Sequence, residues 1–480
     1  MNILFAVPEM VPFIKVGGLA DVAGALPAAL RRLGHDVRVV LPRYRQVRTS
    51  AVPQAGPIAA CFLPVGDRQE PLRIFTASHT TVPVYLLDIP AAFDRDAIYG
   101  YEDDDARFIL FARGVLALIL HLQTLEGWRP DVVHAHDWPA ALLPNYLKTI
   151  YAGALPGIAT VYTIHNLGYQ GVFSPFTLHL SGLGGQGEVE TLAGPAFAGQ
   201  FNFMARGIIF ADVVSTVSPT YAREILTPAY GEGLDGLLRR RRDHLVGILN
   251  GIDVQVFNPA TDPYIAANYS ADDLSGKAIC KAALQRECGF AEEPCRPLLG
   301  MVSRLAPQKG LDLLHMAMPW LIGRTDAHLV ILGTGQPELE QAFAAHMRAH
   351  PDRVNVQLRF DAPLAQRIYA GCDAFLMPSR YEPCGLTQLI ALRYGSVPVV
   401  RATGGLNDTI REGPDGNGFR FGPYEPRALI EAIGRCLAAY RDREGWAALR
   451  MRGMREDHSW EAAAREYVAL YTWARKEIGG

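Results

Sequence analysis

Two stretches decide the fold of the N-terminal part of this chain: ILFAV (3–7) and, after a short connection, KVGGLADV (15–22). The first predicts a buried strand, and the second predicts a glycine-rich loop followed by a helix from about Leu19. A helix N-terminus carries partial positive charge and Lys15 adds a full one. We therefore expect the loop around Lys15, Gly17 and Gly18 to hold an anion such as phosphate. The spacing matches neither the P-loop nor GxGxxG, so a tight strand-to-helix turn with a surface lysine is the alternative.

Length and composition indicate a globular chain of two domains. The 480 residues exceed what one core usually organises, and 49% apolar with 20% charged residues is an ordinary globular composition. The net charge of −3 gives no reason to expect a nucleic-acid partner. We expect no membrane partner, because no window approaches an uninterrupted apolar span of ~20 residues. The sequence makes no prediction of oligomeric state.

The N-terminus and the cysteines favour a cytoplasmic protein. The chain enters a strand at Asn2 without a basic segment or a cleavage-like site. The seven cysteines are odd in number and include no CxxC pair, which suggests reduced thiols.

Apolar runs alternate with helical patterns along the whole chain. Continuous runs suit strands that are buried on both faces, and the intervening helices suit parallel crossovers, so we expect two doubly wound α/β domains. The turn-rich stretch Asn250–Pro259 marks the change of domain, and the last segment, from Ser459, predicts a helix. The expected strands are 2–7, 36–41, 83–88, 131–135, 158–164, 212–217, 246–250, 298–303, 328–333, 354–359, 374–377 and 397–401.

Three loops in the second half carry the residue types of a nucleotide-sugar site. Arg304 and Lys309 follow one strand, and two cations there can neutralise a diphosphate as its bond breaks. Glu382 follows another strand and can accept hydrogen bonds from sugar hydroxyls, while the N–H groups of 385–387 face phosphate. A second glycine pair, Gly404 and Gly405, ends the next strand. The alternative for Arg304 and Lys309 is a pair of surface cations near a loop.

In the first half, Asp137 and His165 end two strands that we expect to be neighbours. Polar residues there are often capped turns, but this edge of the sheet is where ligands bind, so we expect both to touch sugar. The pattern HAHD (134–137) lacks a second cluster of metal ligands, so we predict no zinc. The DxD spacing at Asp103–Asp105 runs into an amphipathic helix, where acidic residues complement the helix dipole, and we predict no metal there either.

Eight segments together resemble the ADP-glucose-dependent glucan synthases, which comprise bacterial glycogen synthase and, at one remove, plastid starch synthase. They appear in the family's order and span residues 1 to about 460. The matching segments are KVGGLADV (15–22), HAHDW (134–138), YTIHNLGYQG (162–171), ADVVSTVSPTYAREI (211–225), GILNGID (247–253), VSRLAPQKG (302–310), PSRYEPCGLTQL (378–389) and TGGLNDT (403–409).

The resemblance implies the GT-B fold, in which two Rossmann-like domains face an interdomain cleft that must close for chemistry. It implies an acceptor-side domain at 1–250, a nucleotide-sugar domain at 260–456, and a C-terminal helix at 457–480 that crosses back to the first domain. The implied reaction transfers glucose from ADP-glucose to the nonreducing 4-hydroxyl of an α-1,4-glucan such as glycogen, with retention at the anomeric carbon and without a cofactor.

The resemblance also assigns roles to individual residues. Lys15 belongs to the loop over the donor's diphosphate and glucose, and His165 lies close to the donor sugar and its reacting carbon. Asp137 and Asn250 are polar residues near the sugars, and Phe360 is where an aromatic ring stacks on adenine. Arg304 and Lys309 bind the diphosphate, and the glucose-binding turn comprises Glu382, Cys384, Gly385, Leu386 and Thr387.

At two positions this chain differs from related sugar transferases or from the bacterial enzymes of the family. Related sugar transferases often carry a second glutamate eight positions after the first, where this chain has Ile390; the glucan synthases also lack that glutamate. Pro139 stands where the bacterial enzymes carry histidine, which bears on local acceptor contacts and not on the reaction.

Three other functions are the alternatives. A nicotinamide oxidoreductase needs GxGxxG on a first βα turn, and the nearest candidate, Gly333–Glu338, lacks the third glycine. A glucan-binding protein without catalysis would not need Lys15, His165, Arg304, Lys309 and Glu382 together. UDP-glucose is the alternative donor, since Phe360 could stack on uracil too.

Overall fold

The computed structural model describes residues 1–50, 52–77, 80–184 and 199–478. Contacts between residues divide it into two compact units. Unit 1 comprises Met1–Asn250 and Trp460–Gly480, and unit 2 comprises Gly251–Ser459. The domain bounds expected from the sequence, 1–250, 260–456 and 457–480, stay a prediction.

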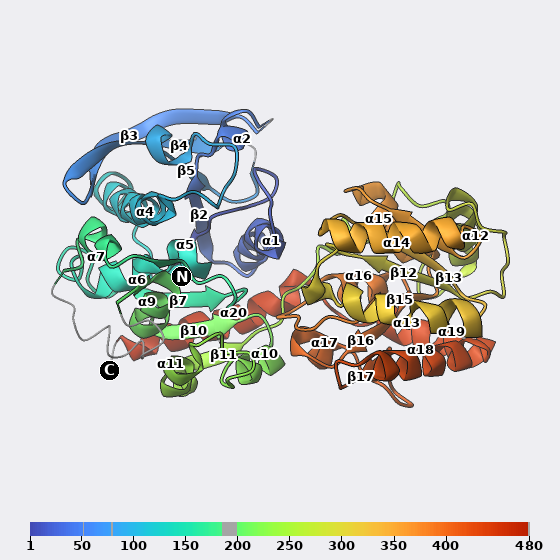
Figure 1. Ribbon diagram of the computed structural model, residues 1–480. Coiled ribbons are helices and arrows are strands. Elements are labelled where there is room, and N and C mark those ends of the chain that lie inside the picture. The colour runs from blue at the N-terminus through green and yellow to red at the C-terminus, as the bar shows by residue number, and fades with distance from the viewer. Residues whose placement is uncertain (51, 78–79, 185–198, 479–480) are drawn as a thin grey trace. The chain divides into compact units, whose positions relative to one another are not determined.

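Unit 1 is built on a nine-stranded sheet with the order β11-β10-β7-β6-β1-β2-β5-β4-β3 (Figure 1). All pairings are parallel except those of the β3–β4–β5 edge, which are antiparallel. A separate pair, β8 (Val172–Phe173) and β9 (Phe201–Asn202), is antiparallel. The strands of the main sheet are β1 (Asn2–Ala6), β2 (Asp36–Pro42), β3 (Gln54–Val65), β4 (Arg68–Ala77), β5 (Val84–Asp88), β6 (Val132–His136), β7 (Ala159–Ile164), β10 (Val213–Thr216) and β11 (Leu245–Gly247).

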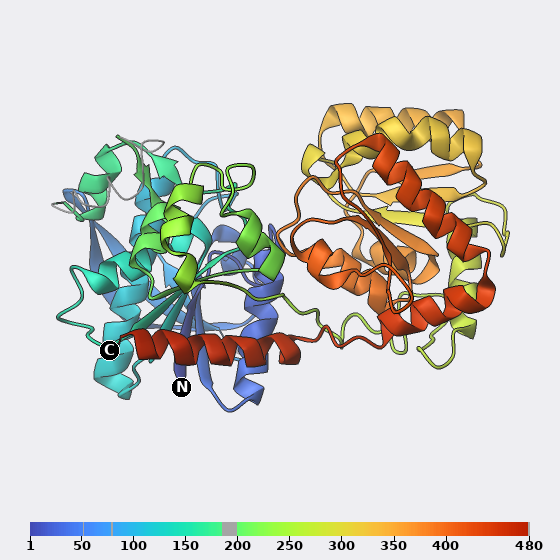
Figure 2. The ribbon, with the colours of Figure 1, turned by 90° about the horizontal axis from the view of Figure 1, so that it is seen from below.

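Helices cover both faces of this sheet. The helices α1 (Gly18–Arg32) and α4 (Asp104–Glu126) lie on opposite sides of β2 (Figure 1). The last helix, α20 (Trp460–Glu477), packs against α1 and runs across β6, β7 and β10 (Figure 2). The shorter helices are α2 (Arg45–Arg48), α3 (Pro90–Phe93), α5 (Asp137–Ala140), α6 (Leu142–Lys148), α7 (Phe176–Ser181), α9 (Phe203–Phe210), α10 (Pro219–Glu224), α11 (Asp235–Arg240) and the 3₁₀ turn η2 (Arg242–His244).

The burial of α4 in unit 1 explains its apolar composition. Among the described residues it is the one helix that is long and apolar enough to cross a membrane. Most of it is buried in unit 1, where it contacts β2 to β5 and the helices α5 to α7. The aspartates of the DxD stretch belong to its N-terminus: Asp103 pairs with Arg95 at 2.5 Å, and Asp104 accepts the Gly100 N–H at 2.8 Å.

Unit 2 is built on a six-stranded, wholly parallel sheet with the order β14-β13-β12-β15-β16-β17. Its strands are β12 (Leu298–Val302), β13 (His328–Leu332), β14 (Val354–Gln357), β15 (Ala374–Met377), β16 (Val397–Arg401) and β17 (Phe419–Phe421). Its helices are α12 (Ser275–Glu287), η3 (Pro307–Lys309), α13 (Leu311–Arg324), α14 (Pro337–Ala349), α15 (Ala362–Gly371), α16 (Thr387–Arg393), α17 (Gly404–Thr409), α18 (Pro426–Tyr440) and α19 (Arg443–Met454).

The expected doubly wound α/β fold is confirmed in both units, and every expected strand is present. The strands that the sequence did not predict are β3, β4, the short strands β8 and β9, and β17. Most residues of β3 are exposed although its segment IAACFLPV (58–65) is apolar, and Pro57 and Pro64 interrupt the pattern of a strand buried on both faces.

Each sheet reverses its winding at one point. In unit 1 the chain goes from β1 to β2 on one side and returns to β6 on the other, and in unit 2 it does the same around β12 and β15. Loops that leave such neighbouring strands diverge and open a crevice at their carboxyl ends, where open α/β sheets bind ligands. The predicted site residues therefore stand at the expected edge of each sheet.

A buried charge cluster fixes the start of β15 against its surroundings. Asp373 is 3% exposed and accepts the N–H of Leu298, the first residue of β12, at 2.9 Å. It also pairs with Lys281 of α12 at 2.7 Å and with Arg450 of α19 at 2.5 Å. Burial alone would raise the pKa of Asp373, but these cations and hydrogen bonds hold it below the usual range. The cluster aligns β12 and β15, whose other ends carry Arg304 and Glu382.

Replacing Asp373 by Asn should destabilise unit 2 by about 3 kcal/mol, because the buried Lys281 and the half-buried Arg450 lose their carboxylate. Urea denaturation measures this loss. Since the folded-state pKa is depressed, the stabilisation is present above the unfolded pKa, so the difference from wild type should shrink as the pH falls through the folded pKa. Glu431→Gln, which breaks the exposed pair with Arg427, is the control and should change little. Equal stability of wild type and Asp373→Asn at neutral pH would contradict this role.

Candidate active site

In unit 1 the loop between β1 and α1 is held by a buried glutamate. Glu9 is 4% exposed, and its Oε2 accepts the N–H groups of Val16 at 2.5 Å and Gly17 at 3.0 Å. Burial raises the pKa of Glu9 despite these two donors. The Gly17 N–H, which we expected to face a ligand, thus donates to Glu9 within the loop in this structure. Lys15 is half exposed and pairs with Asp21 of α1 at 2.7 Å.

Asp137 joins the ends of β6 and β7, which are neighbours as expected. Its Oδ1 accepts the N–H of His165 at 2.7 Å and, at 3.4 Å, the N–H of Asn166. Its backbone has a φ of 53°, a left-handed conformation that is uncommon outside glycine. Desolvation raises the pKa of Asp137 to about 7.

His165 leads from β7 into this region and is held by a second histidine. Its Nε2 lies 3.0 Å from Nδ1 of His136, the last residue of β6. Burial lowers the pKa of His165 to about 3, so the side chain is neutral at physiological pH. A neutral imidazole can donate one hydrogen bond to a hydroxyl and adds no charge.

Asn250 is the last residue of unit 1 before the chain passes into unit 2. It is 8% exposed, and its Oδ1 has no hydrogen-bond partner among the residues that the structure describes. A buried acceptor without a partner is uncommon and marks Asn250 as a place where a ligand can donate.

In unit 2 the loops after β12 and β15 meet in an ion pair. Lys309 Nζ donates to both carboxylate oxygens of Glu382, at 2.6 and 2.9 Å. The Ser379 hydroxyl donates to Glu382 Oε2 at 3.0 Å. Glu382 is 6% exposed, so these contacts stabilise a buried negative charge. Arg304 is exposed and reaches Gln308 at 3.4 Å, within the loop that carries Lys309.

The glycine pair after β16 lets that loop approach the turn around Glu382. The Gly405 N–H donates to the carbonyl oxygens of Glu382 and Pro383, both at 3.1 Å. Gly404 has a φ of 46°, and a Cβ atom there would overlap the Glu382 carbonyl oxygen. The loops after β12, β15 and β16 are thus in contact around Glu382. Cys384 and Gly385 are fixed through their carbonyl oxygens, to which Gln388 donates at 3.1 and 3.0 Å.

The remaining predicted residues lie at the start of α16 and beyond β14. Leu386 caps α16, and the Thr387 hydroxyl, on its first residue, lies 3.2 Å from the sulfur of Met377. Phe360 follows the edge strand β14, which β13 separates from β12, and its side chain is 89% exposed.

Two residues that contact the predicted site residues, Glu9 and His136, were not predicted from the sequence. Glu9 stands in the segment between ILFAV and KVGGLADV, where an acid next to an apolar strand was the available signal. His136 is part of HAHDW, but nothing in the sequence indicated that its ring contacts His165.

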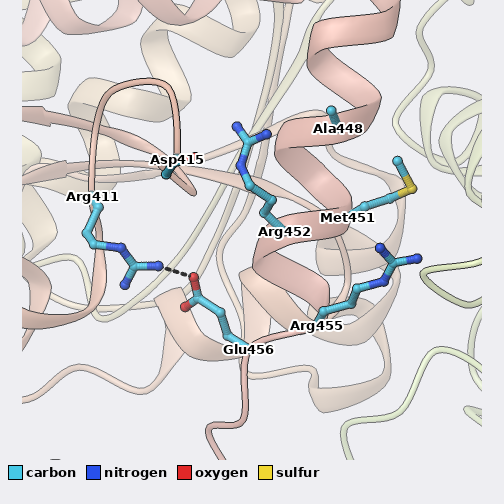
Figure 3. A pocket seen from close by; sticks show the side chains of 7 residues that line it. All are labelled: Arg411, Asp415, Ala448, Met451, Arg452, Arg455 and Glu456. Carbon is cyan, nitrogen blue, oxygen red and sulfur yellow. Dashed lines mark hydrogen bonds and ion pairs between the residues drawn. The ribbon is translucent and has the colours of Figure 1, made fainter.

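A pocket of about 490 Å³ elsewhere in unit 2 contains none of the predicted site residues (Figure 3). Its three arginines already have partners. Arg411 pairs with Glu456 at 2.5 Å, Arg455 pairs with Asp272 at 2.7 Å, and Arg452 donates to the Gly416 carbonyl oxygen at 2.9 Å. The pocket is lined by Arg411, Asp415, Ala448, Met451, Arg452, Arg455 and Glu456.

Comparison with known proteins places both units in one family. Residues 2–240 match the model of the starch synthase catalytic domain, and residues 296–439 match that of the glycosyl transferases group 1. A glycogen synthase of Anaeromyxobacter sp. (strain Fw109-5) is 49% identical over 98% of this chain and 99% of its own length. One from Thermotoga maritima is 44% identical over the full length of both chains.

Solved structures agree with this assignment. The catalytic domain of starch synthase IV from Arabidopsis thaliana, bound to ADP and acarbose, has a TM-score of 0.89 and 35% identity over 99% of both chains. Sucrose-phosphate synthase from Thermosynechococcus elongatus has a TM-score of 0.61 at 18% identity over 98% of both chains, which is a likeness of fold alone. With this fold, these loops and these relatives, the chain belongs to the glycogen and starch synthase family of GT-B glucosyltransferases.

Proposed function

We propose that this glucosyltransferase takes glucose from ADP-glucose and adds it to the nonreducing 4-hydroxyl of an α-1,4-glucan, with retention at the anomeric carbon. The observation that carries the proposal is the contact of Lys309 with Glu382 beside Arg304, at the carboxyl ends of β12 and β15. The Arabidopsis structure of 35% identity, bound to ADP and acarbose, supports an adenine nucleotide as leaving group and a sugar chain as acceptor.

The net charge around Lys309 favours binding of a diphosphate there. Lys309 and Arg304 carry two positive charges, and Glu382 neutralises one of them. One net positive charge therefore remains to attract a departing diphosphate. Because negative charge develops on the leaving oxygen as its bond breaks, cations held in place beforehand stabilise the transition state more than the ground state.

The reaction we infer is a same-face displacement. The acceptor 4-hydroxyl oxygen forms a bond to the anomeric carbon while the bond from that carbon to the phosphate oxygen breaks and leaves its electron pair on ADP. The hydroxyl proton passes to the departing phosphate oxygen. Positioning and electrostatics supply most of the rate enhancement.

The carboxylates favour this displacement over a double displacement through an enzyme-bound sugar. Glu382 accepts hydrogen bonds from Lys309 and Ser379, and Asp137 accepts backbone N–H groups after β7. A carboxylate that is held by such donors is a weaker nucleophile than a bare one. We assign Glu382 to orienting Lys309 and accepting hydrogen bonds from glucose hydroxyls, and His165 to donating to glucose.

We infer that the reaction takes place in the cytoplasm. Buried free thiols such as those of Cys280, Cys288 and Cys372 support a reducing compartment. Among the residues that the structure describes, no group of three or more potential ligands could hold a metal ion.

Replacing Arg304 or Lys309 by Ala should lower kcat roughly a hundredfold, which corresponds to about 3 kcal/mol of transition-state stabilisation. The assay is glucose incorporation into glycogen from saturating ADP-glucose. Arg348→Ala, which removes an exposed cation of α14 in the same unit, is the matched control and should leave kcat unchanged. Near-wild-type kcat in both site variants would contradict the assignment.

ADP-glucose should be used with a kcat/KM at least about tenfold above that for UDP-glucose, a difference of about 1.4 kcal/mol in transition-state binding. The measurement compares initial rates for both donors with glycogen as acceptor. Preference for UDP-glucose would overturn the choice of donor. Absence of nucleotide release with either donor would favour a glucan-binding protein without catalysis.

Asp137→Asn should gain stability relative to wild type as the pH rises from 5 to 8. The pKa of Asp137 is raised to about 7, so the folded state binds more protons than the unfolded state at pH 5, and wild type loses stability as the carboxyl ionises. The amide cannot ionise, and its oxygen still accepts the His165 N–H. The expected relative gain is on the order of 1 kcal/mol, discounted for partial exposure, in thermal unfolding at both pH values. Asp243→Asn, at an exposed position, is the control, and a pH-independent difference for Asp137→Asn would refute the prediction.

A further inference from the structure

Behind His165 lies a buried histidine whose two ring nitrogens have different surroundings. His136 Nδ1 is 3.0 Å from His165 Nε2, whereas His136 Nε2 has no hydrogen-bond partner among the described residues. The ring of His136 is fully buried between aromatic rings: it stacks on Phe5 with centroids 5.2 Å apart and packs at a tilt against His134 with centroids 3.9 Å apart. Such surroundings offer Nε2 no acceptor.

These surroundings favour one tautomer of His136 and, through the hydrogen bond, one tautomer of His165. A neutral imidazole carries a single N–H, and a contact between two ring nitrogens needs one donor and one acceptor. If His136 carried its proton on Nε2, that N–H would be buried without an acceptor, which is rarer in proteins than an unfilled acceptor. With the proton on Nδ1, His136 donates to His165 Nε2, and only a lone pair remains without a partner. His165 then accepts at Nε2 and carries its own proton on Nδ1.

We propose that His136 is a positioning residue: it fixes the tautomer of His165 so that His165 offers its Nδ1–H to the glucose that is transferred. The tautomer follows from unit 1 alone, and the glucose contact rests on the proposed function. Both rings are neutral, since burial lowers the pKa of each. His165 is thereby a donor at Nδ1 and cannot accept a proton from the substrate at Nε2, which the hydrogen bond occupies.

A second layer holds His136 itself. The ring of His134, packed against it at a tilt, contacts a hydroxyl at each nitrogen: Tyr471 of α20 lies 2.9 Å from Nδ1, and Thr163 of β7 lies 2.6 Å from Nε2. Thr163 in turn contacts Ser215 at 2.5 Å. His134 is thus fixed in orientation, and the C-terminal helix supplies one of the two groups that fix it.

The direct test is nitrogen-15 NMR of the protein with labelled histidines, the His165 signals being assigned by comparison with His165→Asn. The chemical shifts distinguish a protonated ring nitrogen from an unprotonated one. The expected result is an unprotonated Nε2 and a protonated Nδ1 in His165. The opposite pattern, or a doubly protonated ring near neutral pH, would overturn the proposal. This measurement needs no activity, so its outcome is separate from that of the proposed function.

Two variants extend the test to catalysis. His136→Phe keeps an aromatic side chain and removes both ring nitrogens. It should lower kcat/KM for ADP-glucose roughly tenfold, the value of one hydrogen bond, and leave the KM for glycogen unchanged. His136→Asn places an amide N–H near the position of Nδ1 and should recover part of the loss. Equal losses in the two variants would indicate a role in packing alone and contradict the proposal.

The matched control is Tyr162→Phe on β7. Its buried hydroxyl has no hydrogen-bond partner among the described residues, so its removal deletes a buried polar group near the site without breaking a contact. It should leave both the His165 shifts and kcat/KM at wild-type values. Should His136→Phe fail to fold, the shifts of the wild-type protein still decide the tautomer.

Discussion

Parallel strand pairing is the constraint on which this structure depends. In a parallel sheet every strand ends at the same edge, and reversal of the winding opens a crevice there between two neighbouring strands. In unit 2 this brings Arg304, Lys309, Glu382 and the glycines of 404–405, which are distant in sequence, to the ends of β12, β15 and β16. The buried cluster around Asp373 aligns the opposite ends of β12 and β15, so the fold and the site share one support.

At that edge the pair of Lys309 and Glu382 links local stability to the proposed chemistry. A carboxylate as buried as Glu382 needs a partner, and Lys309 provides it with two hydrogen bonds. The same pairing holds the ammonium group in place before a ligand binds, so that in the proposed reaction little reorganisation is left for the moment at which the leaving group departs. Gly404 and Gly405 permit this arrangement because a side chain there would overlap the backbone around Glu382.

The sequence was sufficient to predict the strands and loops that depend on a local pattern of residue types. Continuous apolar runs located the strands that are buried on both faces, such as β1 and β12, and chain order then located the loops that follow them. The edge strand β3 was not predicted, because Pro57 and Pro64 interrupt its apolar segment and prolines are typical of edge strands or loops. Contacts between distant residues were not predicted either: no spacing rule says that Glu9 accepts the Gly17 N–H, or that His136 lies against His165. The raised pKa of Asp137 likewise arises from burial, which only the folded chain creates.

A crystal structure of this protein with ADP bound decides whether Arg304 and Lys309 hold the diphosphate. We expect oxygens of the β-phosphate to lie within hydrogen-bonding distance of both the Arg304 guanidinium and the Lys309 ammonium, with Lys309 still in contact with Glu382. A diphosphate bound away from both cations would contradict this expectation.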